Sequence, residues 1–291
     1  MHSTLILGAA LALAPLTARG LAQEPDPNAL PLSFGLYQSD KPTVMYKKFM
    51  PVLEYLQGDL ERRLRQPVDI RLEIFRSYDD GIDALVAGKV DFVRFGPSSY
   101  ITAQGRNPAI RLLAMEHEKR QKRFKGLIVV AKSSPIQSLA DLRGKSFAFG
   151  DPNSTIGRWL VQAELAKAGI RSVDLSSYAY LPRHDAVARA VQMGDFDAGS
   201  IKEGTFEELA KNGDLRILMS FDNVTKPWIA RAGLEARVAD ALKESLFALT
   251  DAAVLKELKV SGFAATSDEE YQLVREGMKL AEAFQAGRGD N

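Results

Sequence analysis

Apolar residues recur with two distinct periods along this chain. From Met45 to Leu64 they return every three or four positions, which is the spacing of an amphipathic helix. Residues 68–74 instead alternate strictly between apolar and polar, as a half-buried strand does. Applied to the whole chain, the two periods predict strands over residues 32–37, 68–74, 90–95, 111–115, 127–131, 145–149, 178–181 and 215–221. They predict helices over residues 45–64, 77–88, 138–142, 159–167, 236–249 and 269–284. Strands that alternate with helices indicate an α/β fold whose sheets are mixed and mainly parallel.

A short pattern occurs twice. Residues 87–92 and 193–198 each end a helix at a glycine, continue into a short strand that carries an aspartate, and lead to a loop. Two copies are too few and too different for a repeat protein, but they fit two similar α/β lobes. Each lobe would then present a loop at the carboxyl end of its strand, where open sheets bind ligands.

Composition and charge narrow the function classes. With 291 residues the chain has room for two domains, and its net charge of +1 gives no general attraction to nucleic acid or membrane. The basic run 119–123 is short and lacks interleaved aromatic residues, so we read it as the exposed turn of a hairpin between strands 111–115 and 127–131. The chain has no cysteine, which excludes disulfides, thiol chemistry and a lipid-anchored cysteine.

The first residues are typical of an export signal. Residues 5–16 form an apolar run too short to span a bilayer, and Gly20 and Ala22 are small residues suited to a cleavage site. We therefore expect a signal peptide over residues 1–22 and a mature protein that is monomeric and periplasmic. A misplaced start codon and a short buried helix are the alternatives.

The strongest chemical signal is the stretch from Phe149 to Trp159. A predicted strand ends in a Gly-Asp-Pro turn, and Ser154 and Thr155 then stand where a helix should begin. A hydroxyl at this position accepts a hydrogen bond from the first turn, and the remaining N–H groups favour an oxyanion. An ordinary helix cap that binds nothing is the alternative.

The sequence offers little support for other chemistry. After the signal peptide it has only two histidines, His117 and His184, and it contains no metal-binding motif, so we expect no metal and no cofactor. The run Gly144-Lys145-Ser146 resembles the end of a phosphate-binding loop, but Leu139 stands where the first glycine of that motif belongs.

Four motifs together resemble a known family. Residues 95–100, 150–155, 184–191 and 196–199 have the order and approximate spacing found in periplasmic substrate-binding proteins of phosphonate, phosphite and phosphate ABC transporters. The resemblance implies a two-lobed type II binding-protein fold with the ligand held between the lobes. On this basis we expect residues 31–126 and 224–291 to form lobe 1 and residues 127–223 to form lobe 2.

The resemblance also implies ligand-binding residues. Tyr100 would place its hydroxyl on the ligand oxyanion, Ser154 and Thr155 would donate hydroxyls, and the N–H groups of Thr155 and Ile156 would assist. His184 would give one imidazole N–H. The family often has a small residue in place of Ile156, whose bulk would shrink the cleft. A core position for Tyr100 and a helix-capping role for His184 are the alternatives.

This chain differs from relatives that bind aminoalkyl phosphonates at the residues expected around the far end of the ligand. Those relatives hold the ammonium with carboxylates, whereas here Glu203 lies beside Lys202, and Lys226 stands where the family has an acid. A lysine repels an ammonium and favours a second negative charge. Exposure of both lysines to solvent is the alternative, and Tyr46 is a weaker candidate for the cavity wall.

The sequence thus predicts a protein that catalyses nothing and delivers a small oxyanion to an ABC permease. Phosphonate, phosphite and phosphate are the expected ligands, although sulfonates, sulfate and larger anions would also suit such a site. A sensory module that feeds a membrane sensor kinase is one alternative. A periplasmic phosphoesterase is the other alternative, for which Ser154 with His184 is the only candidate pair of nucleophile and base.

Overall fold

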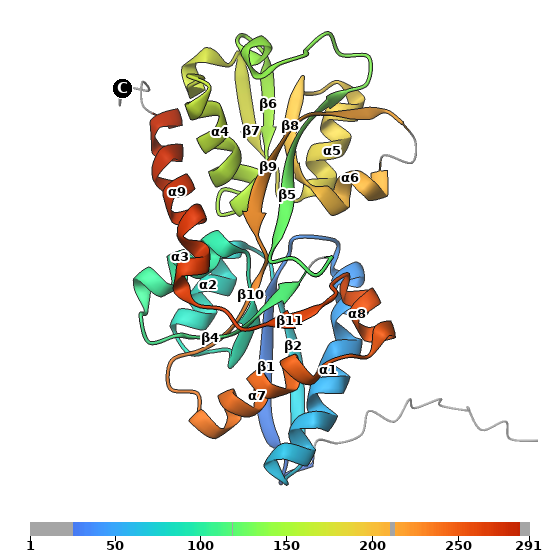
Figure 1. Cartoon of the computed structure of the whole chain (residues 1–291), viewed down its shortest axis with the longest axis vertical. Helices are drawn as coiled ribbons and strands as arrows, with labels where there is room; N and C mark the ends of the chain where they lie inside the picture. The colour runs from blue at the N-terminus through green and yellow to red at the C-terminus, as the bar shows by residue number, and fades with distance from the viewer. Residues whose placement is uncertain (1–25, 118, 210–212, 286–291) are drawn as a thin grey trace, which may run out of the picture.

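The computed structural model describes residues 26–117, 119–209 and 213–285. These residues form two lobes, one above the other, and each lobe has a sheet covered by helices (Figure 1). The predicted signal peptide lies outside the described residues.

Lobe 1 holds a six-stranded sheet with the order β11-β4-β10-β3-β1-β2. β1 runs parallel to β2 and β3, whereas β10 and β11 pair antiparallel. Its elements before the crossing are β1 (Leu30–Tyr37), α1 (Pro42–Leu64), β2 (Val68–Phe75), α2 (Tyr78–Val86), β3 (Phe92–Arg94), α3 (Pro97–Arg106) and β4 (Arg111–His117). The chain returns to this lobe as β10 (Pro227–Ala230), α7 (Ala236–Ala248), α8 (Ala252–Leu258), β11 (Gly262–Ala264) and η5 (Asp268–Tyr271).

Lobe 2 holds a five-stranded sheet with the order β7-β6-β8-β5-β9. β6 runs parallel to β7 and β8, and β5 pairs antiparallel with β8 and β9. Its strands are β5 (Arg123–Ala131), β6 (Ser146–Phe149), β7 (Ser177–Tyr180), β8 (Ala198–Lys202) and β9 (Leu215–Val224). Its helices and turns are η1 (Leu139–Leu142), η2 (Thr155–Leu160), α4 (Val161–Lys167), η3 (Ser172–Asp174), α5 (His184–Met193) and α6 (Glu203–Leu209). The two mixed sheets confirm the expected α/β class, with a larger antiparallel share than expected, because the strands that enter and leave lobe 2 run against their neighbours.

The repeated pattern has the same structural role in both lobes. Asp91 accepts hydrogen bonds from the N–H and hydroxyl of Ser33 in β1, at 2.8 and 3.0 Å. Asp197 accepts the same pair from Ser146 in β6, at 2.8 and 2.9 Å. Each aspartate therefore holds the start of its own short strand against the neighbouring strand of the sheet.

The expected hairpin between residues 111–115 and 127–131 is wrong. β4 pairs with β10 and β11 in lobe 1, whereas β5 pairs with β8 and β9 in lobe 2, so the basic run between them is a crossing between lobes. Local spacing cannot separate the two cases, because a hairpin and a crossing both need two strands and a short polar link.

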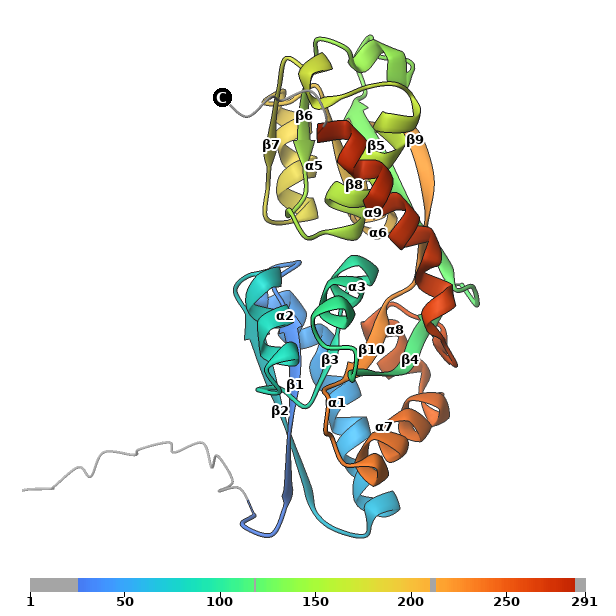
Figure 2. The same ribbon diagram turned by 90° about the vertical axis from the view of Figure 1, so that its left-hand side faces the viewer.

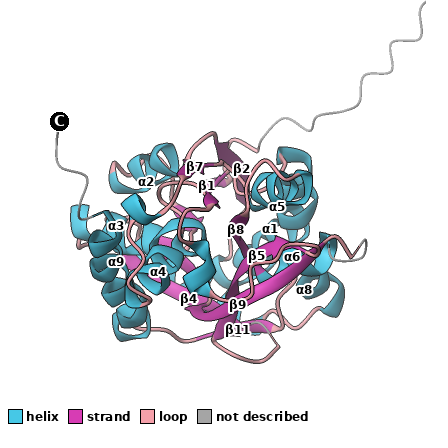
Figure 3. Ribbon diagram, turned by 90° about the horizontal axis from the view of Figure 1, so that it is seen from above, coloured by secondary structure: helices cyan, strands magenta, loops and turns pink. Residues whose placement is uncertain are grey.

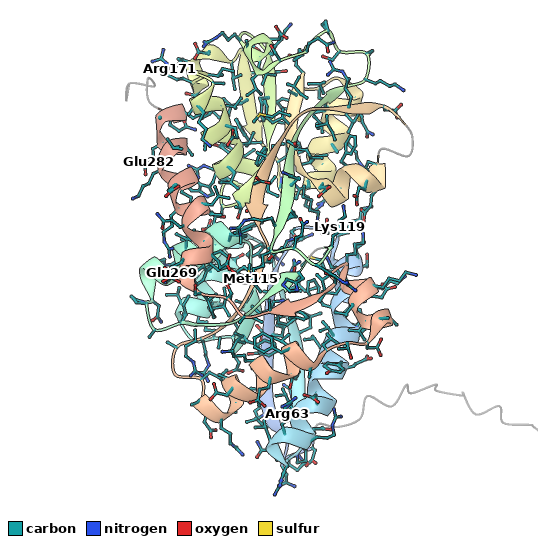
Figure 4. All side chains as sticks on the ribbon, viewed as in Figure 1. Arg63, Met115, Lys119, Arg171, Glu269 and Glu282 are labelled. Atoms are coloured by element: carbon teal, nitrogen blue, oxygen red, sulfur yellow. The ribbon has the colours of Figure 1, made fainter. Side chains whose placement is uncertain are left out.

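The C-terminal helix α9 (Gln272–Gln285) departs from the expected boundaries, which assigned it to lobe 1. The segment starts against lobe 1, where Tyr271 and Val274 are buried, and ends in the core of lobe 2, where Phe284 is buried. Its surface beside α4 and η2 is so close-packed that a side chain at Gly277 would clash with Leu160. Figure 2 shows α9 running along lobe 2, and Figure 4 shows Glu269 near the junction and Glu282 beside lobe 2.

The remaining boundaries differ by a few residues. β5 starts at Arg123, which pairs with Val224 at the end of β9, so lobe 2 begins four residues before the expected Leu127. The two periods predicted only helices after residue 221, so they missed β10 and β11, strands of four and three residues that are too short to show a period.

Candidate functional site

A cavity of about 520 Å³ lies between the lobes and is lined by residues from both of them. Lobe 1 contributes the end of β1, the first turns of α1 and the start of α3, and lobe 2 contributes the starts of η2, α5 and α6. Asn223 and Lys226 line it from the crossing between β9 and β10. The lining includes seven residues that the sequence predicted for the ligand site or near it: Ser154, Thr155, Ile156, His184, Lys202, Glu203 and Lys226.

Two glycines shape the turn that presents Ser154. The N–H of Gly150 donates to the carbonyl of Gly157 at 2.7 Å, and a Cβ on Gly157 would lie 2.6 Å from the Cα of Gly150. The backbone can approach itself this closely only because both residues lack a side chain. The N–H of Gly157 donates to the Ser154 hydroxyl oxygen at 3.0 Å, which confirms the predicted cap.

The helix that begins here presents its first turn to the cavity. Ser154 and Thr155 are both buried, and η2 continues directly into α4. N–H groups in a first helical turn have no acceptor within the helix, so they favour an anion. The side chain of Ile156 packs into the core of lobe 2, and its carbonyl accepts a hydrogen bond from the Ser200 hydroxyl at 2.9 Å.

Hydroxyl groups of the two lobes meet across the cavity. The Ser98 N–H donates to the Thr155 hydroxyl oxygen at 2.9 Å, and the two hydroxyls lie 2.8 Å apart. The Ser98 hydroxyl also lies 2.7 Å from the Asn153 carbonyl, to which it donates. The lobes are therefore closed on each other at the predicted oxyanion site.

Two tyrosines that the sequence did not single out stand behind these hydroxyls. Tyr37 and Tyr78 line the cavity with their rings stacked 3.7 Å apart, and the Tyr37 hydroxyl lies 3.0 Å from that of Ser99. Burial raises the pKa of Tyr37 to about 12, although hydrogen bonds with Ser99 and Gly96 act in the opposite direction. Both phenols therefore stay neutral and serve as hydrogen-bonding groups. Tyr37 ends a predicted strand and Tyr78 follows a predicted helix cap, so their places were predictable but their chemistry was not.

His184 begins α5 and is buried at the cavity wall. Burial lowers its pKa to about 3, and the nearby charge of Lys202 adds to the effect while Asp40 opposes it. The imidazole is therefore neutral, and its one N–H has the Ser200 backbone as its hydrogen-bond partner. Within the described part of the chain its Nδ1 atom has no hydrogen-bond partner.

Lys202 and Lys226, for which exposure to solvent was the alternative, both line the cavity. The Lys202 ammonium lies 2.9 and 3.2 Å from the two carboxylate oxygens of Asp40, which joins the lobes. Burial would raise the pKa of Asp40, but Lys202 lowers it below its usual value. The Lys226 ammonium lies 4.1 Å from the centre of the Phe124 ring. Glu203 stands at the rim, 3.5 Å from Lys119, which Figure 4 places at the junction of the lobes.

A buried ion pair supports the lobe 1 wall. Arg94 donates two hydrogen bonds to Glu116, at 2.8 and 2.9 Å, and the Trp228 indole N–H donates a third at 3.2 Å. Burial would raise the pKa of Glu116, but Arg94 and more distant lysines lower it to about 2. Arg94 lines the cavity, and Lys48 of α1 lies beside it.

The structure contradicts two of the predicted ligand contacts. Tyr100 does not line the cavity, because α3 already begins at Pro97 and its first turn carries the Tyr100 side chain toward the C-terminal segment. Its hydroxyl donates to Asp268 at 2.7 Å and its ring packs 4.9 Å from Tyr271, which matches the core alternative. Ser98, two residues earlier, is the residue of α3 that contacts the start of η2, through Thr155.

Tyr46 is the second correction. It is 57% exposed and absent from the cavity lining, whereas its neighbour Met45 is buried. Successive residues of a helix point about 100° apart, so α1 cannot turn both side chains to the core.

The chemistry of the cavity is that of an anion-binding site. It combines neutral hydroxyl and N–H donors with lysine and arginine side chains, which bind a desolvated anion well. Within the described residues, no hydrogen bond joins Ser154 to His184, and no group of three acidic, histidine or cysteine side chains lies close enough to hold a metal. None of the helices described here is long and apolar enough to cross a membrane.

Comparison with known proteins gives a consistent result. Residues 34–271 match the family described as "ABC transporter, phosphonate, periplasmic substrate-binding protein". A probable ABC transporter phosphite-binding protein, PhnD1 of Prochlorococcus marinus, is 25% identical over 229 residues, which is 74% of each chain. The phosphate-import protein PhnD of Mycolicibacterium smegmatis is 25% identical over 228 residues, covering 68% of this chain and 71% of that one. The solved structure of PhnD1 from Prochlorococcus marinus with methylphosphonate has a TM-score of 0.76 and 22% identity, covering 87% of this chain and 98% of that one.

Proposed function

The chain belongs to the periplasmic substrate-binding proteins of phosphonate ABC transporters, and we propose that its own ligand is a small phosphorus oxyanion held between the lobes. The observation that carries this proposal is the start of η2, where buried Ser154 and Thr155 and the free first-turn N–H groups border an interlobe cavity. The names of two relatives support the ligand class, because PhnD1 is named as a probable phosphite-binding protein and was solved with methylphosphonate, and PhnD of Mycolicibacterium smegmatis is named as a phosphate-import protein.

In the proposed complex the oxyanion sits against the first turn of η2. Ser154 donates its hydroxyl and the N–H groups of Thr155 and Ile156 donate along the helix axis, while the Thr155 hydroxyl joins the site to Ser98 of the other lobe. Neutral donors suit this task, because they stabilise a dehydrated anion without attracting every anion in solution. Ser98 supports the assignment from the opposite lobe, since its hydroxyl reaches the same group of donors.

The family delivers a ligand to a permease and is not a family of enzymes. For this chain we further propose that closure around the ligand is its whole activity, that it works as a monomer, and that it reaches the periplasm by removal of residues 1–22. A permease can select the closed form only if the ligand binds that form better than the open one.

Thermal unfolding with and without ligands tests the proposal. The protein without its first 22 residues is heated with phosphite, phosphate, methylphosphonate, sulfate or taurine. A ligand present at 100 times its dissociation constant adds about 2.7 kcal/mol to the free energy of unfolding. That raises the midpoint by roughly 2–4 °C per kcal/mol for a chain of this size.

The variant Thr155→Val should abolish the shift, because it replaces the hydroxyl that joins the two lobes at the site by a methyl group. Thr205→Val is the matched control, since Thr205 is equally buried in lobe 2 but does not line the cavity. A shift with sulfate or taurine alone, or a shift that survives in Thr155→Val, would count against a phosphorus oxyanion at this place.

A further inference from the structure

We propose that Lys48 binds a second acidic group on the ligand, so that the cavity takes a phosphonate that carries a carboxylate at its far end. This inference rests on the proposed function, because it assumes that the start of η2 holds the phosphonate group.

Lys48 lines the cavity from α1, between the buried residues Met45 and Phe49. Among the residues that the structure describes, the only partner of its ammonium is the Phe49 ring, whose centre lies 5.7 Å away. A contact at that distance is weak compared with a hydrogen bond to a carboxylate. The N–H groups of the Lys48 ammonium are therefore available to a ligand.

The charges that face Lys48 are mostly of the same sign. Arg94, Lys202 and Lys226 act on it as cations, and the carboxylates of Glu116 and Asp40 oppose them. Burial, reinforced by these cations, holds the pKa of Lys48 well below its usual range. An anionic group in the cavity would remove this penalty.

The carboxylates near Lys48 are already taken. Glu116 accepts two hydrogen bonds from Arg94 and one from Trp228, and Asp40 is bound by Lys202. Glu116 cannot turn to Lys48 without breaking a buried ion pair, and Asp40 cannot do so without breaking the partly buried ion pair that joins the lobes. The missing partner must therefore come with the ligand.

Asn223 gives a second, independent indication of a polar ligand group. It lines the cavity and is 1% exposed, yet neither its amide nitrogen nor its amide oxygen has a hydrogen-bond partner within the described residues. It lies opposite Phe124, the residue whose ring carries the Lys226 ammonium. Buried polar atoms are normally satisfied, so an unpartnered amide here indicates a group that the ligand supplies.

The size of the cavity agrees with a two-ended ligand. About 520 Å³ lies within the range of pockets that enclose drug-sized molecules, and phosphite or methylphosphonate has only four or five heavy atoms. A ligand held at η2 alone would leave Lys48 facing unfilled space. A carboxylate beside Lys48 would pair with its ammonium, whereas an ammonium in that place would be repelled by Lys48, Arg94 and Lys202.

Titration calorimetry with three ligands tests the inference. Methylphosphonate has one acidic end, 3-phosphonopropionate has two, and 2-aminoethylphosphonate has an ammonium in place of the second. We expect 3-phosphonopropionate to bind at least about tenfold more tightly than the other two, since a hydrogen bond to a charged group is worth roughly ten- to a hundredfold in affinity.

The variant Lys48→Met should remove that advantage and change the affinity for methylphosphonate by less than about threefold. Lys47→Met is the matched control, because it deletes the same charge from the adjacent, exposed position at the cavity mouth. An equal loss in both variants would show a general attraction to positive charge and would overturn the assignment to Lys48.

The wild-type protein gives a readout that does not depend on the variant folding. Binding of 3-phosphonopropionate at alkaline pH should take up protons, because the second acid favours the charged form of Lys48, and methylphosphonate should not. Equal proton uptake with the two ligands, or tighter binding of methylphosphonate, would overturn this inference and leave the proposed function intact. Failure of all three phosphonates to bind would overturn both.

Discussion

His184 shows how one buried side chain makes this cavity sensitive to acid. Its pKa falls to about 3 because the imidazole is buried and lies near the positive charge of Lys202. In the unfolded chain the pKa would be about 6.5. Above that value both states are neutral, and below it only the unfolded state takes up the proton, so acid favours unfolding.

We therefore predict that the free energy of unfolding falls as the pH is lowered from about 6.5 toward 3. His184 alone contributes a slope of about 1.4 kcal/mol per pH unit. Urea unfolding at pH 7.5, 6.5 and 5.5 measures this slope in a range where carboxylates add little. His184→Gln should flatten it, whereas His117→Gln, which alters a histidine outside the cavity lining, serves as the control. An unchanged slope in His184→Gln would contradict the prediction.

Individual residues show which parts of the site can be predicted from the sequence. Ser154 was predictable, because its role depends on local turn chemistry and on a helix that begins at the next residue. Asp40 and Lys48 were not, because their roles arise from partners more than forty positions away, such as Lys202 and Arg94. Tyr100 was misassigned because nothing local distinguishes a hydroxyl that faces the cavity from one that faces Asp268.

At the scale of elements, the turn from β6 to η2 controls the site. The backbone of Gly150 and that of Gly157 touch, so the turn has no space for a side chain. The contact fixes where the first turn of η2 stands relative to the cavity.

Gly157→Ala tests this contact. Its Cβ would lie 2.6 Å from the Cα of Gly150, a backbone atom that cannot rotate away. We expect a loss of roughly 1–3 kcal/mol in the free energy of unfolding, as for other overpacked sites, together with at least about tenfold weaker ligand binding.

Gly105→Ala is the control for that variant. Gly105 lies in helix α3 with nothing within 4 Å of the added Cβ, so alanine there should stabilise by about 0.5–1 kcal/mol. Denaturant unfolding of both variants measures the change in the free energy of unfolding, and titration calorimetry measures the change in ligand affinity. Retained binding in Gly157→Ala would show that the turn can shift without harm.

Element types were predicted better than element partners. The period of apolar residues identified α1, β2 and α2 because their buried faces are long enough to repeat. The same periods assigned β4 and β5 to one hairpin, because strand pairing depends on chain segments far away in the sequence.

At the scale of the whole molecule, α9 ties the lobes together. Val274 near its start is buried in lobe 1 and Phe284 is buried in lobe 2, where its ring packs 5.4 Å from that of Phe149. The crossings between β4 and β5 and between β9 and β10 are the other two connections.

Phe284→Ala should therefore weaken lobe 2 in particular. Removal of a buried phenylalanine costs about 3–5 kcal/mol, because it deletes apolar contacts and leaves a cavity. Leu280→Ala, on the same helix but 41% exposed, should change the free energy of unfolding by less than about 0.5 kcal/mol. Urea unfolding followed by hydrogen exchange shows which lobe loses protection, and equal losses in both lobes would count against the prediction.

The path of α9 also has a mechanical consequence. In the view from above, α9 and α5 lie on opposite sides of the molecule (Figure 3). The three connections restrain the lobes, so the motion left to them is a small rotation about an axis near α9 and the crossings. The contacts furthest from that axis separate most, among them the one between Asp40 and Lys202. Ligand would then enter and leave at that rim. The width of the gap between the lobes there would differ between the empty and the ligand-bound protein, and a membrane partner that contacts both lobes could sense the difference.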